Sequence, residues 1–347
     1  MSGFAKIVAP ESLKEINNLY YSMGLTDGLP IVPPTPDSVN EMIAASGRDA
    51  QEIIGYVPPK KGAATVEKIA INAVMAGCLP EYLPVVIAGL EACLEEQFNI
   101  YGVQNTTNPV TPALIVHGPV AKSLEVNGEY DCLGSGARAN ATIGRALKLA
   151  LLNIGGGTHR GTHGQPGRYT YCFAENEEKS PWPPFHTDRG FAAGDSAVTV
   201  FGAGGSVNMR PYGGRGREVL ASIARMMALG GSPRHSYCLV ILNPEHARLI
   251  AADGFSKQSA RDFLYEHARV RPNGFPDAVA QAWIDEPLME YMDFRKMLGG
   301  VTKDTFIPGC DAPEHILILV AGGSGGHCTF VPACFTQPVP VMTKRVR

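Results

Sequence analysis

Four glycine-rich stretches constrain this chain more than any other feature. They span residues 134–144, 155–167, 202–216 and 322–326, and each lies next to a strongly apolar segment. The 39 glycines and 27 prolines among 347 residues exceed their average share of about 12%, without forming a low-complexity tail. Because glycine has no Cβ, it lets the backbone approach other backbone or a ligand closely. The stretches therefore predict close-approach loops between packed elements.

Apolar spacing along the chain alternates between the helical and the extended pattern. Helical periodicity covers 11–24, 36–47, 65–76, 80 to about 97, 137–154 and 217–229, with further helices from Pro244 and Ser256. Short, continuously apolar runs typical of buried strands occupy 113–116, 197–201, 237–242 and 315–320. This alternation predicts an α/β fold.

The chain divides into three segments. Residues 1–60 form a helical and extended N-terminal segment, 61–190 a first α/β half and 191–347 a second α/β half. Residues 113–128 and 239–254 share an order of strand, proline, basic residue, apolar pair and glycine. This echo predicts two related halves about a pseudo-twofold axis, with a ligand in the cleft between them. A chance match, with its one-residue shift, is the alternative.

Charge and cysteine usage exclude several classes. Thirty Lys and Arg against 33 Asp and Glu give a net charge of −3, which argues against nucleic acid and anionic membranes as partners. No apolar run reaches the roughly 18 residues of a membrane span. The N-terminus lacks a secretory apolar region, and the eight cysteines form no CxxC pair, so we expect a cytoplasmic protein with reduced thiols.

One glycine-rich loop opens a helix and is followed by basic and amide side chains. Free backbone N–H groups at a helix start attract anions, and arginine pairs with carboxylate or phosphate. Arg210 lies in a second such loop. The spacing matches neither nucleotide-binding glycine motif, and tight packing with solvated arginines is the alternative. The predicted binding residues for a small anionic substrate are Gly134, Ser135, Gly136, Arg138, Asn140, Arg145 and Arg210.

Residues 157–188 gather an unusual number of ligand-type side chains. His159 and His163, four residues apart, are candidate ligands for a divalent metal. Glu175, Glu177 and His186 are candidate acid–base residues, if burial raises the pKa of a carboxyl group. The alternative is an exposed acidic turn.

Two further residues stand at predicted helix starts. Cys78 precedes Pro80 by two residues, so the positive end of the following helix would stabilise its thiolate. His246 lies in the first turn of a helix that follows a strand, a position aimed at the cleft of α/β proteins. A structural, buried cysteine and an ordinary core or surface histidine are the alternatives.

Several long blocks resemble a widespread, uncharacterised bacterial protein family. They are DGLPIVPPT (27–35), AGCLPEYLPVV (76–86), RANATIGRAL (138–147), CFAENEEKSPW (172–182) and PEHARLIAADGFSK (244–257), and they spread over nearly the whole chain. The family is associated with redox proteins that carry a UGSC-like motif. The resemblance implies thiol or selenol chemistry and a small redox partner protein. Its blocks contain Cys78, Glu175, Glu177 and His246, but not the segment of His159.

These observations predict an enzyme that acts on a small carboxylate or phosphate by lyase or hydrolase chemistry, and a homo-oligomer on general grounds. Cys78 would be the nucleophile, and Glu175, Glu177 or His186 would move the proton. One alternative is a non-catalytic subunit that binds a ligand or a partner. Another is a metal-dependent hydrolase using His159, His163 and His186; beyond that divalent metal, no cofactor is predicted.

Overall fold

The computed structural model describes residues 10–157, 161–228, 237–274, 276–285, 300–333 and 341–347. Helices and strands alternate, which confirms the α/β class. The helices are α1 (Leu13–Ser22), α2 (Pro36–Ser46), α3 (Val66–Ala76), α4 (Leu83–Cys93), α5 (Ile100–Asn105), α6 (Pro119–Ser123), α7 (Arg138–Asn153), α8 (Gly216–Ala228), α9 (Pro244–Ala252), α10 (Lys257–His267) and α11 (Asp277–Asp285). Within these ranges, no helix has both the length and the apolar character that crossing a membrane requires.

In the described part of the chain the strands form two four-stranded sheets and two two-stranded sheets. The strands are β1 (Ile53–Val57), β2 (Gly62–Thr65), β3 (Thr111–His117), β4 (Cys172–Ala174), β5 (Ala197–Ala203), β6 (Val207–Met209), β7 (Cys238–Leu242), β8 (Arg269–Val270), β9 (Ile307–Pro308), β10 (Ile316–Val320), β11 (Cys328–Pro332) and β12 (Met342–Arg345). The first sheet has the order β12-β5-β3-β4 and the second β10-β7-β11-β6. The two-stranded sheets pair β1 with β2 and β8 with β9, both antiparallel.

Both sheets follow one pairing pattern. Each contains a single parallel pair, β3 with β4 and β7 with β10, and its other neighbours are antiparallel. Strand β6 follows β5 in the chain but joins the second sheet, whereas β12 follows β11 but joins the first. The matching order is consistent with two related units, one running from β3 to β6 and the other from β7 to β12, that exchange one strand each. The pseudo-twofold repeat itself stays a prediction.

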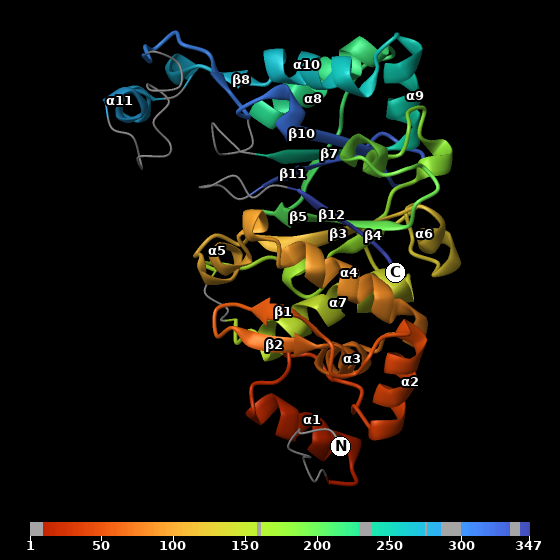
Figure 1. Ribbon diagram of the computed structural model, residues 1–347. Helices are drawn as coiled ribbons and strands as arrows, with labels where there is room; N and C mark the ends of the chain where they lie inside the picture. The colour runs from red at the N-terminus through yellow and green to blue at the C-terminus, as the bar shows by residue number, and fades with distance from the viewer. Residues whose placement is uncertain (1–9, 158–160, 229–236, 275, 286–299, 334–340) are drawn as a thin grey trace.

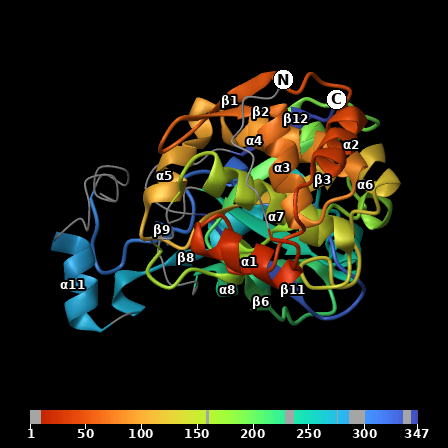
Figure 2. The same cartoon turned by 90° about the horizontal axis from the view of Figure 1, so that it is seen from below.

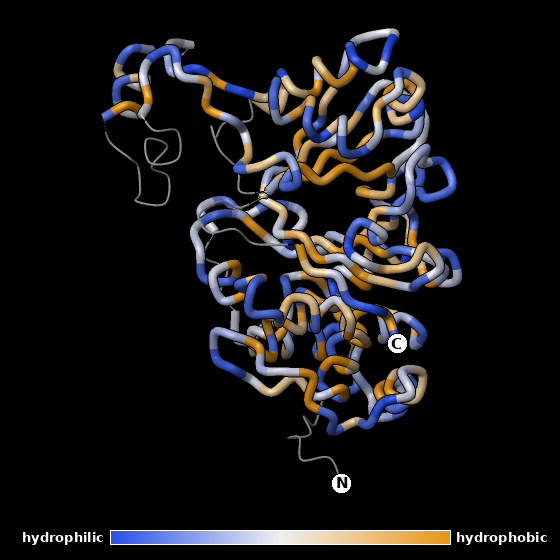
Figure 3. The backbone as a smooth tube through the Cα atoms, turned by 45° about the horizontal axis from the view of Figure 1, so that its top comes forward, coloured by the Kyte–Doolittle hydropathy of each residue, from blue (hydrophilic) through white to orange (hydrophobic). Residues whose placement is uncertain are grey.

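The molecule is built in four layers. Helices α4 and α7 cover the outer face of the first sheet and α3 packs on α7, the two sheets face each other, and α8, α9 and α10 cover the second sheet (Figure 1). The most hydrophobic backbone runs through these central strands (Figure 3). Helix α11 lies to one side of the body in both orthogonal views (Figure 2).

Alternation along the strands divides the apolar side chains among three cores. In β3, Leu114 packs against the helices, whereas Ile115 packs in the core between the sheets. In β7, Val240 faces the outer helices and Ile241 the core between the sheets. Because these strands are buried on both faces, their sequences read as continuous apolar runs.

Local capping explains several helix limits. The Thr65 side chain accepts a hydrogen bond from the Lys68 backbone, and Gly77 ends α3 in a left-handed conformation (φ +87°). The helix predicted from Pro80 to about residue 97 begins where predicted but ends earlier, at Cys93. A 3₁₀ turn, Pro80–Tyr82, precedes α4, and another, Glu96–Phe98, follows it. Because Pro84 has no N–H to donate, it fits only the first turn of a new helix.

Candidate metal centre

Four ligand-type side chains meet beside the carboxyl ends of β3 and β4. His117 is the last residue of β3, and Glu175 directly follows β4. Glu177 and His186 lie in two short 3₁₀ turns, Glu177–Lys179 and Phe185–Arg189. One ligand atom from each of the four side chains lies within 4.8 Å of the other three. Parallel neighbouring strands end at the same sheet edge, which brings the first two residues together.

Distances within this cluster match the spacing of metal ligands. His117 Nδ1 lies 3.2 Å from Glu175 Oε2, and His186 Nδ1 lies 3.7 Å from Glu177 Oε1. Bonds of about 2.1 Å to a tetrahedral divalent ion separate two ligand atoms by about 3.4 Å. The two pairs lie on either side of that value, so small side-chain adjustments would complete the coordination.

Hydrogen bonds orient both imidazoles. His186 Nε2 lies 3.0 Å from the Ala192 carbonyl oxygen, which can only accept, so Nε2 carries the proton and Nδ1 presents a lone pair. That Nδ1 is buried and has no hydrogen-bond partner among the described residues. His117 Nε2 lies 2.9 Å from Thr199 Oγ1, which is 3.0 Å from Thr343 Oγ1. Such outer contacts commonly fix the rings of metal-ligating histidines.

Backbone N–H groups hold the carboxylates. The Phe185 N–H donates to Glu175 Oε2 at 2.7 Å, and the Gly118 N–H donates to Glu177 Oε1 at 2.8 Å. Gly118 has φ +73°, and a Cβ there would lie 2.1 Å from the Asp195 carbonyl oxygen. Only glycine therefore lets the chain turn after β3 and present this N–H to Glu177.

A hollow of about 300 Å³ borders the two carboxylates. Its lining combines β3–α6 and β4 residues with the acidic turn, and comprises Gly118, Ala121, Lys122, Val126, Gly128, Glu129, Ala174, Glu175, Asn176, Glu177 and Glu178. Four of these side chains are carboxylates and one is an ammonium group. The Lys122 ammonium pairs with Glu178, so the hollow is acidic overall.

The cluster unites three predicted catalytic residues, Glu175, Glu177 and His186, but not Cys78. No hydrogen bond or ion pair in the described ranges joins Cys78 to these three side chains. Cys78 is buried, and this burial raises the pKa of its thiol to about 12. Desolvation therefore opposes the predicted thiolate more strongly than the Thr142 hydrogen bond and the Arg138 charge favour it.

The predicted anion loop uses its polar groups within the protein. Arg145 binds both oxygens of Asp27 at 2.7 and 2.8 Å, and Arg138 donates to the Gly77 carbonyl oxygen at 3.1 Å. The Asn140 amide binds the backbone at Asn127 and Cys132.

The remaining parts of the predicted anion sites lie on the surface. Gly134, Ser135 and Gly136 form an exposed turn, in which the Gly134 N–H donates to the Asp131 carbonyl oxygen at 2.7 Å. Arg210, in the second loop, is also exposed, and its guanidinium lies 5.6 Å from the centre of the Tyr212 ring. None of the predicted anion-binding residues lines the hollow beside the metal cluster.

Two histidines of the predicted metal site lie elsewhere. His163 is exposed and does not belong to the cluster. His159 falls outside the described residues. Of the described histidines that were predicted to bind a metal, His186 belongs to the cluster, together with His117, Glu175 and Glu177, and His163 does not.

His246 has a different environment from the cluster. It lies in α9, and its Nδ1 is 3.1 Å from the Sγ of Cys328, the first residue of β11. The Asn243 amide nitrogen lies 3.1 Å from the same Nδ1 and donates to the carbonyl oxygens of Gly325 and His327. The structure thus gives the predicted histidine a cysteine partner, but Cys328 rather than Cys78.

Sequence reasoning missed His117, although a usable signal was present. The residue directly follows the apolar run 113–116 and precedes a Gly-Pro turn. The rule that polar groups after α/β strands face the cleft, which singled out His246, applies equally to His117. The sequence alone does not show that β3 pairs with β4, and it is this pairing that places Glu175 beside His117.

No protein-family model matches this chain, and no curated protein is significantly similar to it. The resemblance to the bacterial family therefore stays a prediction.

Proposed function

We propose that this protein is a divalent-metal-dependent hydrolase, with His117, Glu175 and His186 as its metal ligands and Glu177 beside them as the general base. One observation carries the proposal. The Nδ1 atom of the buried His186 has no hydrogen-bond partner among the described residues, His186 offers a ring nitrogen within 4.8 Å of ligand atoms of His117, Glu175 and Glu177, and the two carboxylates line the 300 Å³ hollow. A buried polar atom without a partner is costly, and a cation there would remove that cost.

The four side chains differ in exposure. The side chains of His117 and His186 are 0% exposed and that of Glu175 is 1% exposed, whereas Glu177 is 23% exposed and lines the hollow. The three buried side chains suit permanent ligands, and a bound divalent ion would supply a Lewis acid and an activated water. Glu177 is then the residue that accepts a proton from the water.

The charge of the hollow restricts the substrate. Glu129, Glu175, Glu177 and Glu178 line it together with Lys122. The four carboxylates carry four negative charges, whereas Lys122 and a divalent cation would together carry three positive charges. The lining would therefore stay negative even with the metal bound. We therefore favour a neutral or cationic substrate, such as an amide or ester, over the small anion that the sequence predicted.

Metal content tests this function directly. The protein is purified without chelators, and its metal is quantified by elemental analysis and by Zn²⁺ titration. We expect about one ion per chain, lost in His186→Ala and Glu175→Gln. His163→Ala is the matched control and should keep the ion, because His163 lies outside the cluster. Equal metal content in all three variants would exclude this centre.

Hydrolysis is tested separately from metal binding. The zinc-loaded protein is assayed against a panel of ester and amide substrates. Glu177→Gln should lower kcat on a responsive substrate by about 10²–10⁴-fold, while much of the metal affinity remains. Metal binding without turnover of any substrate would leave a metal-binding protein and contradict the hydrolase assignment.

The Cys328–His246 contact favours a second candidate function, an enzyme with a cysteine nucleophile. Burial raises the pKa of Cys328 to about 12 and lowers the pKa of His246, so both groups are neutral at rest. Attack would require His246 to take the thiol proton as the substrate arrives. Loss of turnover in Cys328→Ser, with metal content unchanged, would favour this candidate over the metal centre.

A further inference from the structure

A second cavity lies at the opposite end of β3 from the metal centre. It has a volume of about 70 Å³ and is lined by Val103, Gln104, Val110, Thr111, Pro112, Lys148, Leu151, Leu152, Gly157 and Arg168. Thr111 begins β3 and His117 ends it, so the two sites are about 20 Å apart at 3.3 Å per residue. The cavity is therefore a separate site.

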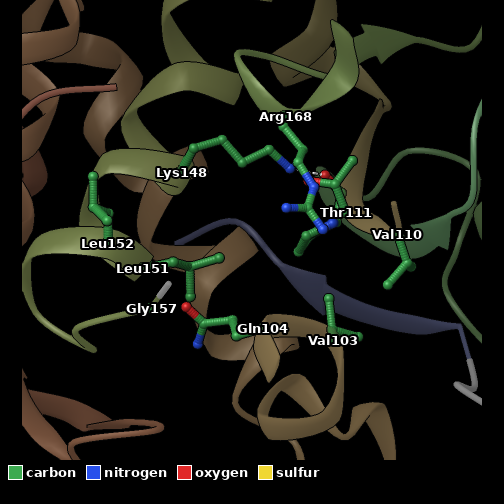
Figure 4. Close-up of a pocket in the computed structure, with 10 residues that line it drawn as sticks. Val103, Gln104, Val110, Thr111, Lys148, Leu151, Leu152, Gly157 and Arg168 are labelled. Carbon is green, nitrogen blue, oxygen red and sulfur yellow. Dashed lines mark hydrogen bonds between the residues drawn. The ribbon is translucent and has the colours of Figure 1, made fainter. Parts of the chain in front are cut away.

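Two cations line this cavity. Figure 4 shows the Lys148 side chain reaching from α7 toward the Arg168 guanidinium, beside Thr111. The lining contains no carboxylate, and no ion pair in the described part of the chain joins either cation to one. Valine and leucine side chains form much of the remaining wall.

Backbone carbonyls are the hydrogen-bond acceptors that these cations use. The Lys148 ammonium donates to the Pro112 carbonyl oxygen. Arg168 donates to the carbonyl oxygens of Asn108 at 3.0 Å and Pro109 at 3.4 Å. Carbonyl dipoles satisfy some of the N–H groups, but they supply no negative charge to balance the Arg168 guanidinium or a protonated Lys148. Like charges so close together in a partly apolar site favour an anion between them.

We propose that this cavity binds the carboxylate of a small organic acid with a short aliphatic tail. The carboxylate would lie between Lys148 and Arg168, and the tail would pack against Val103 and Leu151. A cavity of about 70 Å³ with a largely apolar wall suits a short-chain acid, and butyrate serves as the probe.

Protonation couples to this binding. Burial, with the Arg168 charge acting in the same direction, lowers the pKa of Lys148 to about 7. The other titratable groups that face Lys148 are the thiols of Cys93 in α4 and Cys172 in β4, both protonated because burial raises their pKa values. A bound carboxylate favours the charged ammonium, so binding at pH 8 takes up a proton.

Calorimetric titration with butyrate tests the proposal, with n-butanol as the uncharged comparison and inorganic phosphate as the alternative oxyanion. Butyrate should bind at least tenfold more tightly than butanol or phosphate. At pH 8, titrations in buffers of different ionisation enthalpy should reveal uptake of nearly one proton, and at pH 6 almost none. Binding of phosphate alone, equal binding of butanol, or no proton uptake at pH 8 would overturn the proposal.

Two variants and one control locate the site. Lys148→Met and Arg168→Met should each weaken butyrate binding at least tenfold. Arg189→Met is the matched control, since Arg189 is also partly buried and donates to a carbonyl oxygen, that of Val341, away from this cavity. Circular dichroism verifies that each variant is folded, and Lys148→Gln replaces any Met variant that is not. Unchanged affinity in the folded cavity variants would refute the site.

Discussion

His186 Nδ1 lies 3.7 Å from Glu177 Oε1, and the imidazole is completely buried. The ring's proton is directed to the Ala192 carbonyl oxygen, so Nδ1 presents a lone pair toward a carboxylate oxygen. Two electron-rich atoms this close repel each other unless a cation or a proton lies between them. This close approach of two acceptor atoms therefore supports a bound cation more directly than the acidic residues do by themselves.

Thr199→Val should weaken metal binding. Thr199 Oγ1 contacts His117 Nε2 at 2.9 Å and fixes that ring. Loss of such an outer contact typically lowers metal affinity by about 10–100-fold. Thr343→Val is the graded control, because Thr343 contacts Thr199 but not the histidine, and it should have a smaller effect. Competition titration with Zn²⁺ measures both; equal affinities in wild type and Thr199→Val would contradict the role of His117.

Gly118→Ala should damage both stability and the centre. The new Cβ would lie 2.1 Å from the Asp195 carbonyl oxygen at a positive φ, with an expected loss of about 3 kcal/mol. Gly190 also has a positive φ, but nothing lies within 4 Å of its Cβ position, so Gly190→Ala should cost only about 1 kcal/mol. Denaturant unfolding compares the two variants. Metal affinity should fall only in Gly118→Ala, whose N–H holds Glu177; a similar cost at both positions would reject the close-contact argument.

Much of the fold could be predicted from the sequence because burial is periodic. The runs 237–242 and 315–320 are apolar on both faces, and the structure confirms them as β7 and β10. Capping at Thr65 and Gly77 likewise marks the limits of α3. Short or exposed strands could not be found in this way. Strand β4 has only three residues and β6 is mostly exposed, so neither leaves a clear apolar pattern in the sequence. Both strands are defined by pairing with partners that are distant in the sequence.

The candidate site was predictable only in part. Glu175, Glu177 and His186 lie close in sequence, and their concentration was visible. His117 joins them through the β3–β4 pairing, 58 residues from Glu175. The opposite error concerns Arg145, which looked available for a ligand. Its partner Asp27 is 118 residues away, and no local pattern reveals that pair.

Arg145→Met should act on stability rather than on ligand binding. The side chains of Arg145 and Asp27 are 14% and 7% exposed, and the guanidinium also binds the Pro30 carbonyl oxygen. Breaking such a pair leaves an uncompensated carboxylate, at a cost of about 3 kcal/mol or more. The double variant with Asp27→Asn should recover part of that loss in chemical denaturation. A weaker ligand affinity with unchanged stability would instead support the substrate-binding role predicted from the sequence.

Lys148→Met should flatten the pH dependence of stability. The pKa of Lys148 is about 7 in the folded protein and 10.5 in its ordinary state, so between these values the unfolded chain binds more protons. Lys148 therefore contributes a stability that rises with pH, by up to about 1.4 kcal/mol per unit. Buried thiols such as Cys93 oppose this trend at high pH in both proteins. The difference between wild-type and variant unfolding free energies isolates Lys148; a constant difference from pH 7 to 10 would contradict the buried, neutral amine.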